Sequence, residues 1–468
     1  MRARFAPSPT GSLHLGNART AIFNYLLARA MGGALVLRVE DTDRERSDSR
    51  YETEQLETLE WLGVVFDESP AAGGPRGPYR QSQRLELYAR VLEELSGRAE
   101  VYPCYCTDEE LAAARKQMLA KGQPPRYPGT CYRLSPARRR ELEAAGRRPA
   151  MRLHVPGGRS VHFVDAVFGP QTFNTSLIGD FVLMKADGTP TYNFAAAVDD
   201  HYMGITHVLR GADHLPNTPR QLIIYELMGW QPPVFAHHGL LVGPDGKKLS
   251  KRHGPVRVEA YRAAGVLPEA LANYLGWLGG GVGSEGRAMD LEEMAQLFEL
   301  TRLSRSPVVF DPARLRWLGG AHMRRLEPLE LLRRLEQERG MNFEGLSRAR
   351  AEELGRICQE NAHDLAEAEA VARMILEGPA SPPALEGPQR ELLAMAAASL
   401  PPHGFANEQE AGTWIKALGK TSGLKGKNLY MPLRLALTGS RKGPELVRIL
   451  TVLEREELAR RLDAAARG

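Results

Sequence analysis

His14 and Gly16 lie where a short extended segment passes into a helical pattern, in the stretch RFAPSPTGSLHLGNARTAIFNYLLARA. The amino end of a helix carries free N–H groups and a partial positive charge, so it attracts anions. A glycine there lets a ligand approach the backbone, and a histidine can donate a hydrogen bond to a phosphate oxygen. The turn contains neither Gly-Lys-Ser/Thr nor GxGxxG. The junction therefore has features of an anion site but lacks the P-loop lysine.

A second cationic segment, Lys248-Leu249-Ser250-Lys251-Arg252, lies in the loop GPDGKKLSKRHG. Taken alone, such a segment is typical of a solvated basic loop, and a lone His14 is typical of a capping or solvated residue. Both features on one α/β domain favour a shared site for a polyphosphate.

The elements around His14 follow a βαβ pattern. Apolar residues at helical spacing follow Gly11 and stop at Gly32-Gly33. The run ALVLRVED, residues 34–41, predicts a buried parallel strand, and residues 52–63 predict an amphipathic helix. In such folds the ligand crevice lies beyond the carboxyl ends of the strands. The residues expected on that edge are His14, Gly16, Glu40 and Asp41.

Changes in composition and in residue pattern along the chain divide it into four parts. After residue 80 come clustered cysteines, a stretch rich in proline and arginine, and short alternating runs, which predict an inserted domain. Strands and turns of the α/β kind then resume, and helical patterns dominate the end of the chain. We expect a split catalytic domain over 1–80 and 186–236, an insertion over 81–185, a loop and helical domain over 237–320, and a helical region over 321–468.

The bulk composition narrows the class of protein. The chain has 468 residues, 43% of them hydrophobic, which allows more than one core. A net charge of +4 permits a polyanionic partner without requiring one. No apolar run approaches the length of a membrane span and the first residues lack an apolar signal core, so we expect a cytoplasmic protein.

Several motifs resemble those of one family. His14-Leu15-Gly16-Asn17 is similar to the HIGH signature of class I aminoacyl-tRNA synthetases, and the KLSKR segment is similar to their KMSKS loop. The flanking stretches RFAPSPTG, RVEDTD, GPYRQSQR, TYNFAAAVDDHYMGITHVLRG, NTPRQ, KLSKRHG and GLKGKNLYMPLRLALTG resemble glutamyl-tRNA synthetases of the bacterial type. The resemblance runs from about residue 2 to about residue 450.

The resemblance implies an α/β fold: a Rossmann-like class I catalytic domain with an inserted α+β domain, followed by an all-helical anticodon-binding region. It also implies an AMP-forming glutamate–tRNA ligase. The implied partners are ATP with Mg²⁺, whose protein ligands are not assigned, L-glutamate and tRNA-Glu, and we expect a monomer without membrane contact. Such chemistry rests on positioning and charge neutralisation, so no covalent nucleophile is needed.

The resemblance assigns residues to ATP. His14 would hold phosphate oxygens, Gly16 would make room for the adenine–ribose end, and Lys251 would stabilise pyrophosphate. Lys248 and Ser250 would shape the loop. The full implied set is Thr10, His14, Gly16, Asn17, Lys248, Leu249, Ser250, Lys251 and Arg252, with His14, Gly16, Lys248 and Lys251 as the catalytic residues.

The implied glutamate site combines two arginines with one acid. An arginine fork suits a carboxylate, so Arg4 is expected to bind the side-chain carboxylate, with Arg210 as the second arginine. Glu40 is expected to bind the ammonium group, although a capping or surface role is the alternative. Ala6, Ser8 and Tyr192 complete the implied set. Where many relatives have RGEDH, this chain has RGADH, so no role is carried over to Ala212.

Three cysteines, Cys104, Cys106 and Cys131, lie within one short part of the insertion, which favours a metal site over disulfides. Zinc usually takes four ligands. Some relatives supply a tyrosine four residues before the last cysteine, the place of Tyr127 here, whereas Arg133 replaces the histidine of others. We expect structural Zn²⁺ on these three cysteines and Tyr127; the alternative is reduced, metal-free thiols. The solitary Cys358 is expected to be a buried helix residue.

The last part of the chain is expected to bind the anticodon, on the strength of the resemblance. Trp414 and Tyr430 could stack on bases, but both residue types are more often core residues in such helices. Relatives strict for tRNA-Glu often have an arginine where Asn361 is the nearest match, so charging of tRNA-Gln is a hypothesis. The scattered cations here are Arg324, Arg325, Lys416, Lys420, Lys425 and Lys427.

Three other functions compete with this interpretation. A glutaminyl-tRNA synthetase is disfavoured because its anticodon half resembles β-barrels, and a cofactor nucleotidyltransferase would be shorter and lack the KLSKR segment. A non-catalytic tRNA-binding paralogue would require damaged motifs. The residues that it would be expected to lose are intact: His14, Gly16, Glu40, Lys248 and Lys251.

Overall fold

A computed structural model describes residues 1–43, 45–247, 249, 256–283 and 286–468. Lys248, Ser250, Lys251 and Arg252 therefore lie outside the described residues. The chain forms two compact units. The first, the catalytic unit, contains residues 1–259, 272–283 and 289–310, and the second, the helical unit, contains residues 260–271, 286–288 and 311–468. The finer division at residues 81, 186, 237 and 321 remains a prediction.

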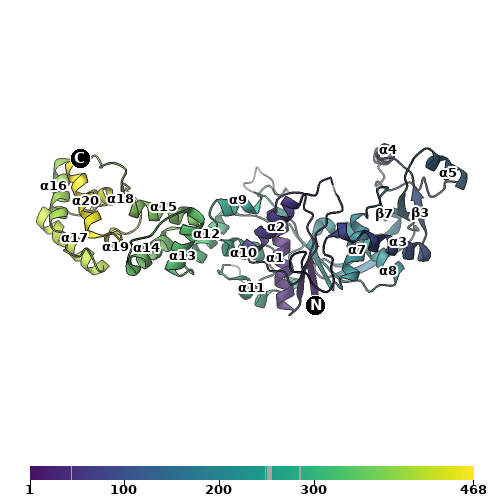
Figure 1. The fold of residues 1–468 in the computed structure, drawn as a ribbon, viewed down its shortest axis with the longest axis horizontal. Helices are drawn as coiled ribbons and strands as arrows, with labels where there is room; N and C mark the ends of the chain where they lie inside the picture. The colour runs from purple at the N-terminus through teal and green to yellow at the C-terminus, as the bar shows by residue number, and fades with distance from the viewer. Residues whose placement is uncertain (44, 248, 250–255, 284–285) are drawn as a thin grey trace. The chain divides into compact units, whose positions relative to one another are not determined.

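A parallel sheet forms the centre of the catalytic unit, with the strand order β2-β1-β8-β9. Its strands are β1 (Arg2–Phe5), β2 (Ala34–Leu37), β8 (His207–Gly211) and β9 (Val234–His238). Helices α1 (Leu15–Ala30), α2 (Ser49–Trp61), α7 (Tyr192–Tyr202) and α8 (Thr218–Met228) connect or flank these strands (Figure 1). This is the Rossmann-like α/β arrangement that the sequence predicts.

The β1–α1–β2 unit forms for local reasons. Residues 2–5 are an almost fully buried strand, and α1 buries Ala18, Ile22 and Leu26. Gly32, with a φ of +56°, adopts the left-handed conformation that ends the helical run. β2 ends at Leu37, earlier than the predicted strand 34–41, but the backbone N–H groups of Arg38 and Glu40 still donate to the carbonyls of Phe5 and Pro7, so the chain continues alongside β1.

The insertion is an α+β domain, as predicted, and its helices α4 and α5 lie far from α1 within the catalytic unit (Figure 1). It contains an antiparallel sheet ordered β3-β4-β7 and a separate hairpin of β5 and β6. Its strands are β3 (Val101–Cys104), β4 (Ala150–Leu153), β5 (Ser160–Asp165), β6 (Gly169–Asn174) and β7 (Phe181–Met184). Its helices are α3 (Leu85–Arg98), α4 (Asp108–Ala120), α5 (Pro136–Ala144) and α6 (Thr175–Ile178). Apolar residues of α3, β4 and β7 share one core with α7 and α8, which joins the insertion to the sheet.

The chain returns to the catalytic unit after β9. Strand β10 (Leu241–Val242) pairs in parallel with β11 (Val308–Val309), and α11 (Leu291–Leu297) packs against α1. Helices α9 (Val258–Ala263) and α10 (Pro268–Trp277) contribute residues to both units. Arg19 of α1 is buried and donates to the carbonyl groups of Gly239 and Leu278, so it ties α1 to these later segments.

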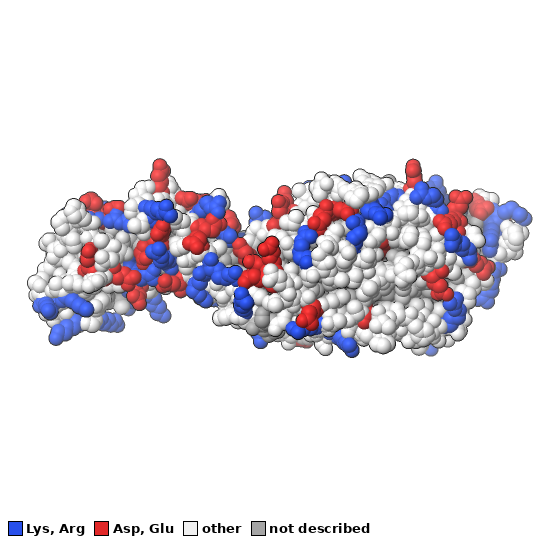
Figure 2. All heavy atoms as spheres, turned by 90° about the horizontal axis from the view of Figure 1, so that it is seen from below, with Lys and Arg blue, Asp and Glu red and all other residues white. Residues whose placement is uncertain are grey.

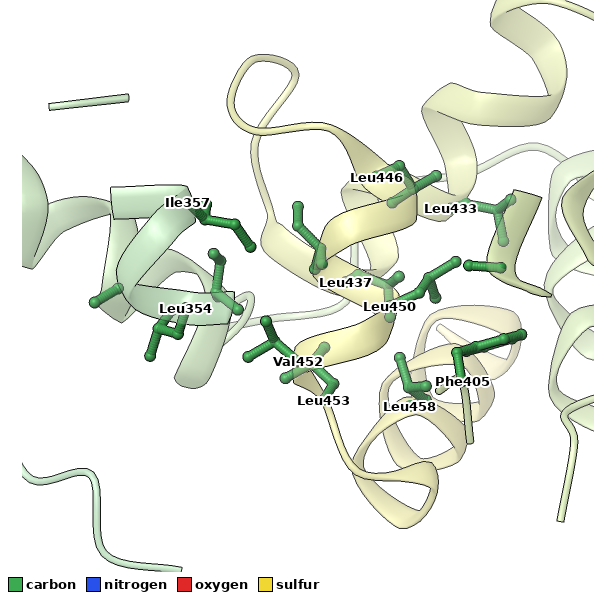
Figure 3. Close-up of a cluster of buried hydrophobic side chains, with 14 of the residues drawn as sticks. Leu354, Ile357, Phe405, Leu433, Leu437, Leu446, Leu450, Val452, Leu453 and Leu458 are labelled. Atoms are coloured by element: carbon green, nitrogen blue, oxygen red, sulfur yellow. The ribbon is translucent and has the colours of Figure 1, made fainter. Parts of the chain in front are cut away.

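The helical unit is built from helices from α12 onward, as the sequence predicts for the last part of the chain. Its helices are α12 (Pro312–Met323), α13 (Pro328–Arg339), α14 (Arg348–Asn361), α15 (Leu365–Leu376), α16 (Gly387–Ala398), α17 (Glu408–Ser422), α18 (Lys427–Thr438), α19 (Leu446–Val452) and α20 (Arg455–Arg467). Their apolar faces share one core, in which Leu354 and Ile357 of α14 face α19, with Val452 beside them (Figure 3). Cys358 is fully buried there, as predicted.

The two candidate stacking residues differ in exposure. Trp414 is 9% exposed and its indole N–H donates to the carbonyl of Ser399, so it is a core residue. Tyr430 is 44% exposed. Lys416, Lys420, Lys425 and Lys427 are also exposed on α17, α18 and the turn between them. Basic and acidic side chains mix over this unit, and basic ones gather at the left end of Figure 2.

Among the described residues, no helix combines the length and the apolar character that crossing a membrane would require.

Candidate active site

A cavity of about 650 Å³ opens at the carboxyl ends of β1 and β8 in the catalytic unit. Every predicted glutamate-site residue lines it: Arg4, Ala6, Ser8, Glu40, Tyr192 and Arg210. The described members of the predicted ATP set line the same cavity: Thr10, His14, Gly16, Asn17 and Leu249. The structure thus brings the helix N-terminus and the two arginines to one hollow of nucleotide size. Several other residues that were not predicted from the sequence also line the cavity: Arg19, Thr20, Asp213, His214 and His238.

His14 is the N-cap of α1. Its backbone is extended, and its ring Nδ1 accepts a hydrogen bond from the Asn17 N–H at 3.2 Å. Because Nδ1 is the acceptor, the proton of a neutral imidazole is on Nε2, where it can be donated. A Cβ at Gly16 would lie 3.2 Å from this ring. The glycine therefore makes room for the imidazole as well as for any ligand.

Arg210, at the carboxyl end of β8, is 4% exposed and fixed by four hydrogen bonds. Its Nε donates to His237 at 3.1 Å, and its Nη1 donates to the Tyr192 hydroxyl at 3.1 Å. Its Nη2 donates to Thr218 at 2.8 Å and to Gln221 at 3.1 Å. A guanidinium has five N–H groups, so one on Nη1 has no partner among the described residues.

Arg210 also has no carboxylate partner within salt-bridge distance among the described residues. Burial lowers its pKa, and the charge of Arg4 adds to that effect. A buried cation without a counter-charge is costly, so the site favours an anionic ligand. The neighbouring His214 has its pKa lowered to about 4 by burial and by Arg210, so it is neutral at pH 7.

Arg38, directly after β2, organises the acids beside the cavity and is fully buried. Its Nη1 donates to Asp200 at 2.6 Å, its Nη2 donates to Glu40 at 3.1 Å, and its Nε lies 3.8 Å from Asp199. Asp200 also accepts from Arg4 Nε at 3.2 Å. Arg38 thereby holds Glu40 directly and Arg4 through Asp200.

The acids of this network have opposite pKa shifts. Burial raises the pKa of Glu40 despite the opposing charge of Arg38. Burial also acts on Asp200, but the charges of Arg38 and Arg4 together hold its pKa below the ordinary value. Glu40 is 8% exposed and lines the cavity, so a capping or surface role does not describe it.

The cysteine cluster lies in the insertion, where Cys104 and Cys131 are buried. The three sulfur atoms lie within 4.8 Å of one another. The Tyr127 hydroxyl is 3.4 Å from Cys104 Sγ and 3.6 Å from Cys106 Sγ, and Cys106 and Cys131 Sγ are 3.5 Å apart. Arg133 bonds the carbonyl of Pro128 instead. The cluster is compatible with a metal ion.

Comparison with known proteins places these features in a family. Residues 1–317 match the family described as tRNA synthetases class I (E and Q), catalytic domain, and residues 323–466 match an anticodon binding domain. The glutamate–tRNA ligase of Carboxydothermus hydrogenoformans is 42% identical over 99% of both chains. That of Listeria monocytogenes is 40% identical over 99% of this chain and 98% of its own.

A solved structure gives the same result. The crystal structure of a glutamate tRNA ligase from Elizabethkingia meningosepticum, in complex with its amino acid, has a TM-score of 0.88 and 32% identity. The match covers 100% of this chain and 99% of that one. The chain is therefore an enzyme of the class I tRNA synthetases and belongs to the family of glutamate–tRNA ligases.

Proposed function

We propose that the chain activates L-glutamate with ATP and transfers the glutamyl group to the 3′ end of tRNA-Glu. One observation carries this proposal. A single cavity has a helix N-terminus with His14 and Gly16 among its walls, together with two buried arginines, Arg4 and Arg210, and the acid Glu40. A phosphate and a dicarboxylic amino acid can therefore meet in one enclosed place.

In the first step, an oxygen of the glutamate α-carboxylate attacks the α-phosphorus of ATP. The bond from that phosphorus to the bridging oxygen breaks and pyrophosphate leaves with the electron pair, which gives glutamyl-adenylate. Charge spreads over the phosphate oxygens as the reaction proceeds. The Nε2–H of His14 and the N–H groups at the start of α1 are the described donors that would stabilise it.

Arg4 and Arg210 would select glutamate. Arg210 lacks an acidic partner among the described residues, so a substrate carboxylate would supply the missing counter-charge. Glutamine would place a neutral amide against Arg4, which keeps Asp200, and would lose the charge-assisted pair that a glutamate side chain forms there, which is a basis for rejection. Glu40 would accept the substrate ammonium group, with Ser8 and Tyr192 as neighbouring hydroxyl groups.

In the second step, a hydroxyl of the terminal ribose of tRNA attacks the activated carbonyl carbon, and AMP leaves. Mg²⁺ would enter with ATP and neutralise phosphate charge. Among the described residues that line the cavity, Asp213 is the carboxylate without an arginine partner, and so the one carboxylate available to the ion. Because one side chain cannot fill the coordination sphere of Mg²⁺, phosphate oxygens and water would provide most of its ligands.

We propose structural zinc on Cys104, Cys106, Cys131 and Tyr127. Tetrahedral zinc with bonds of about 2.3 Å to sulfur and about 2.0 Å to oxygen places two sulfur ligands about 3.8 Å apart and sulfur and oxygen about 3.5 Å apart. The separations of 3.4 Å, 3.6 Å and 3.5 Å fit that geometry. When bound, zinc would brace the insertion beside the acceptor end of tRNA.

The helical unit would bind the anticodon, and we propose that the enzyme works as a cytoplasmic monomer. Asn361, exposed at the end of α14, donates to the carbonyl of Ile357 and is the nearest match to a position where strict relatives often have an arginine, so it brings no positive charge there. We therefore propose that tRNA-Gln is also charged. The test is charging of purified tRNA-Gln, with Asn361→Arg expected to lower charging of tRNA-Gln more than that of tRNA-Glu. Lack of charging by the unaltered chain at high enzyme concentration would rule this out.

The main proposal is tested by ATP–pyrophosphate exchange and by aminoacylation, each with glutamate and with glutamine, in the presence and absence of tRNA. We expect exchange with glutamate when tRNA is present, and little with glutamine. Exchange with glutamine in preference to glutamate would favour a glutaminyl synthetase. Binding of tRNA without any exchange or aminoacylation would favour the non-catalytic alternative.

A further inference from the structure

His237, buried on β9, connects Arg210 to an acid of the insertion. The sheet register pairs Arg210 of β8 with His237 of β9, so their side chains lie on the same face. Arg210 Nε donates to His237 Nε2 at 3.1 Å. On the other side of the ring, His237 Nδ1 is 2.6 Å from the Asp165 carboxylate, and both side chains are 0% exposed.

The surroundings of Asp165 fix which ring nitrogen carries the proton. Its Oδ1 accepts the backbone N–H groups of Val167 at 3.0 Å, Phe168 at 2.8 Å and His237 at 3.2 Å. These bonds and His237 outweigh burial and lower the pKa of the carboxyl group. An ionised carboxylate only accepts, so His237 must donate from Nδ1 and keep its Nε2 lone pair for Arg210.

The Thr218 hydroxyl agrees with this assignment. It accepts from Arg210 Nη2 at 2.8 Å and lies 3.3 Å from His237 Nε2, to which it can donate its own proton. A second positive charge beside Arg210 is unfavourable. Burial and the guanidinium accordingly lower the pKa of His237.

We propose that Asp165 and His237 are a positioning pair, in which a neutral imidazole held in the Nδ1–H tautomer sets the plane of the Arg210 guanidinium for the substrate carboxylate. This rests on the proposed role of Arg210 in binding glutamate. Asp165 ends β5 of the insertion, and this turn docks on the sheet through a bond from the Ala166 N–H to the carbonyl of Phe235 at 2.9 Å. The amino-acid site thus depends on the seating of the insertion.

The substitution Asp165→Asn tests the tautomer. If the oxygen of the new asparagine amide faces the backbone N–H groups, its NH₂ group faces His237 Nδ1. Nδ1 must then accept, so the ring proton moves to Nε2, where it faces the Arg210 Nε–H and the bond between these two residues is lost. The opposite amide orientation leaves the N–H groups of Val167 and Phe168 facing another donor. We expect the KM for glutamate to rise about tenfold or more, with the KM for ATP changed by less than about twofold.

Two further variants separate positioning from folding. His237→Leu should raise the KM for glutamate like Asp165→Asn, whereas His237→Gln should restore part of the affinity because its amide oxygen can accept from Arg210. Asp180→Asn is the matched control. Asp180 pairs with His154 at 3.1 Å in the same insertion and does not line the cavity, so the KM for glutamate should stay unchanged.

The tautomer itself is read from ¹⁵N NMR of histidine-labelled resting enzyme, with the His237 signals assigned by their loss in His237→Gln. We expect a protonated Nδ1 in the unaltered chain and a protonated Nε2, or a mixture, in Asp165→Asn. An unprotonated Nδ1 in the unaltered chain would overturn the proposal. So would equal rises in both KM values, or the same effect from Asp180→Asn. The NMR result needs no catalysis, so failure of the glutamate–tRNA ligase assignment would be seen separately, as absence of glutamylation.

Discussion

Replacing Arg38 with methionine tests the buried charge network beside the cavity. The change keeps most of the side-chain volume but removes the cation that Glu40, Asp199 and Asp200 share. Asp200 keeps Arg4, but Glu40 keeps no basic partner among the described residues. An unpaired buried carboxylate is strongly unfavourable, so we expect the free energy of unfolding to fall by about 3–5 kcal/mol.

A loss of that size corresponds to a lower Tm of roughly 5–8 °C for a unit of about 300 residues. Differential scanning calorimetry of the whole chain measures it. The relevant transition is the one that a non-reactive glutamyl-adenylate analogue raises, because that ligand binds the catalytic unit. Arg46→Met is the matched control. Arg46 is 76% exposed in its pair with Asp43, so its loss should leave the Tm nearly unchanged.

The pH dependence of the Arg38→Met effect has a definite sign. Burial already raises the pKa of Glu40 in the folded chain, and without Arg38 the pKa should rise further. A folded-state pKa above the unfolded value means that the folded chain binds the proton more tightly, so protonation stabilises it as pH falls. The deficit in Tm should therefore shrink between pH 8 and pH 5. A loss below about 1 kcal/mol, or one that is the same at both pH values, would refute the reasoning.

Two other changes have equally specific outcomes. Gly16→Ala places a Cβ 3.2 Å from the His14 ring, so kcat for aminoacylation should drop about tenfold or more, whereas Gly11→Ala, with nothing within 4 Å, should leave it within about twofold. Equal effects would show that the approach to the ring is unimportant. Cys106→Ser should abolish the zinc found by elemental analysis of purified chain and lower the Tm, and Cys358→Ala should retain the metal. A metal-free unaltered chain would contradict the zinc proposal.

The walls of the cavity could be predicted from sequence because local signals place them. His14 caps a recognisable helix, Gly16 lies in the first turn of that helix, and Glu40 comes shortly after a recognisable strand. Those junctions must meet at the carboxyl edge of a parallel sheet. The fold class followed from the same alternation of elements. Cys358 and Trp414 are core residues as their residue types predict, whereas Tyr430 is exposed because it points away from the apolar face of α18.

The residues that hold the cavity lining in place could not be predicted. Arg38 appears in the sequence as one charge in RVED, and its pairing with Asp200 joins residues 162 positions apart. His237 lies in an apolar strand, and its role emerges only when the strand order puts β9 beside β8. Buried charges inside apolar runs, in RVED and in AAAVDDH, were the signal that such a network exists. Their partners depend on the tertiary fold.

The double use of His14 restricts which residues this position can tolerate. Its Nδ1 accepts from the Asn17 N–H, which also donates to the His14 carbonyl at 2.9 Å, while its other nitrogen carries a donor. Lysine has donors only, so its side chain could not cap α1 and the Asn17 N–H would keep only the backbone carbonyl. Asparagine would cap the helix, but its shorter side chain could not place a donor where Nε2 lies. The shortfall is on the order of one bond length, an ångström or more. Imidazole supplies an acceptor and a donor at two edges of one rigid planar ring. Selection for capping of α1 and selection for catalysis would therefore act on the same side chain.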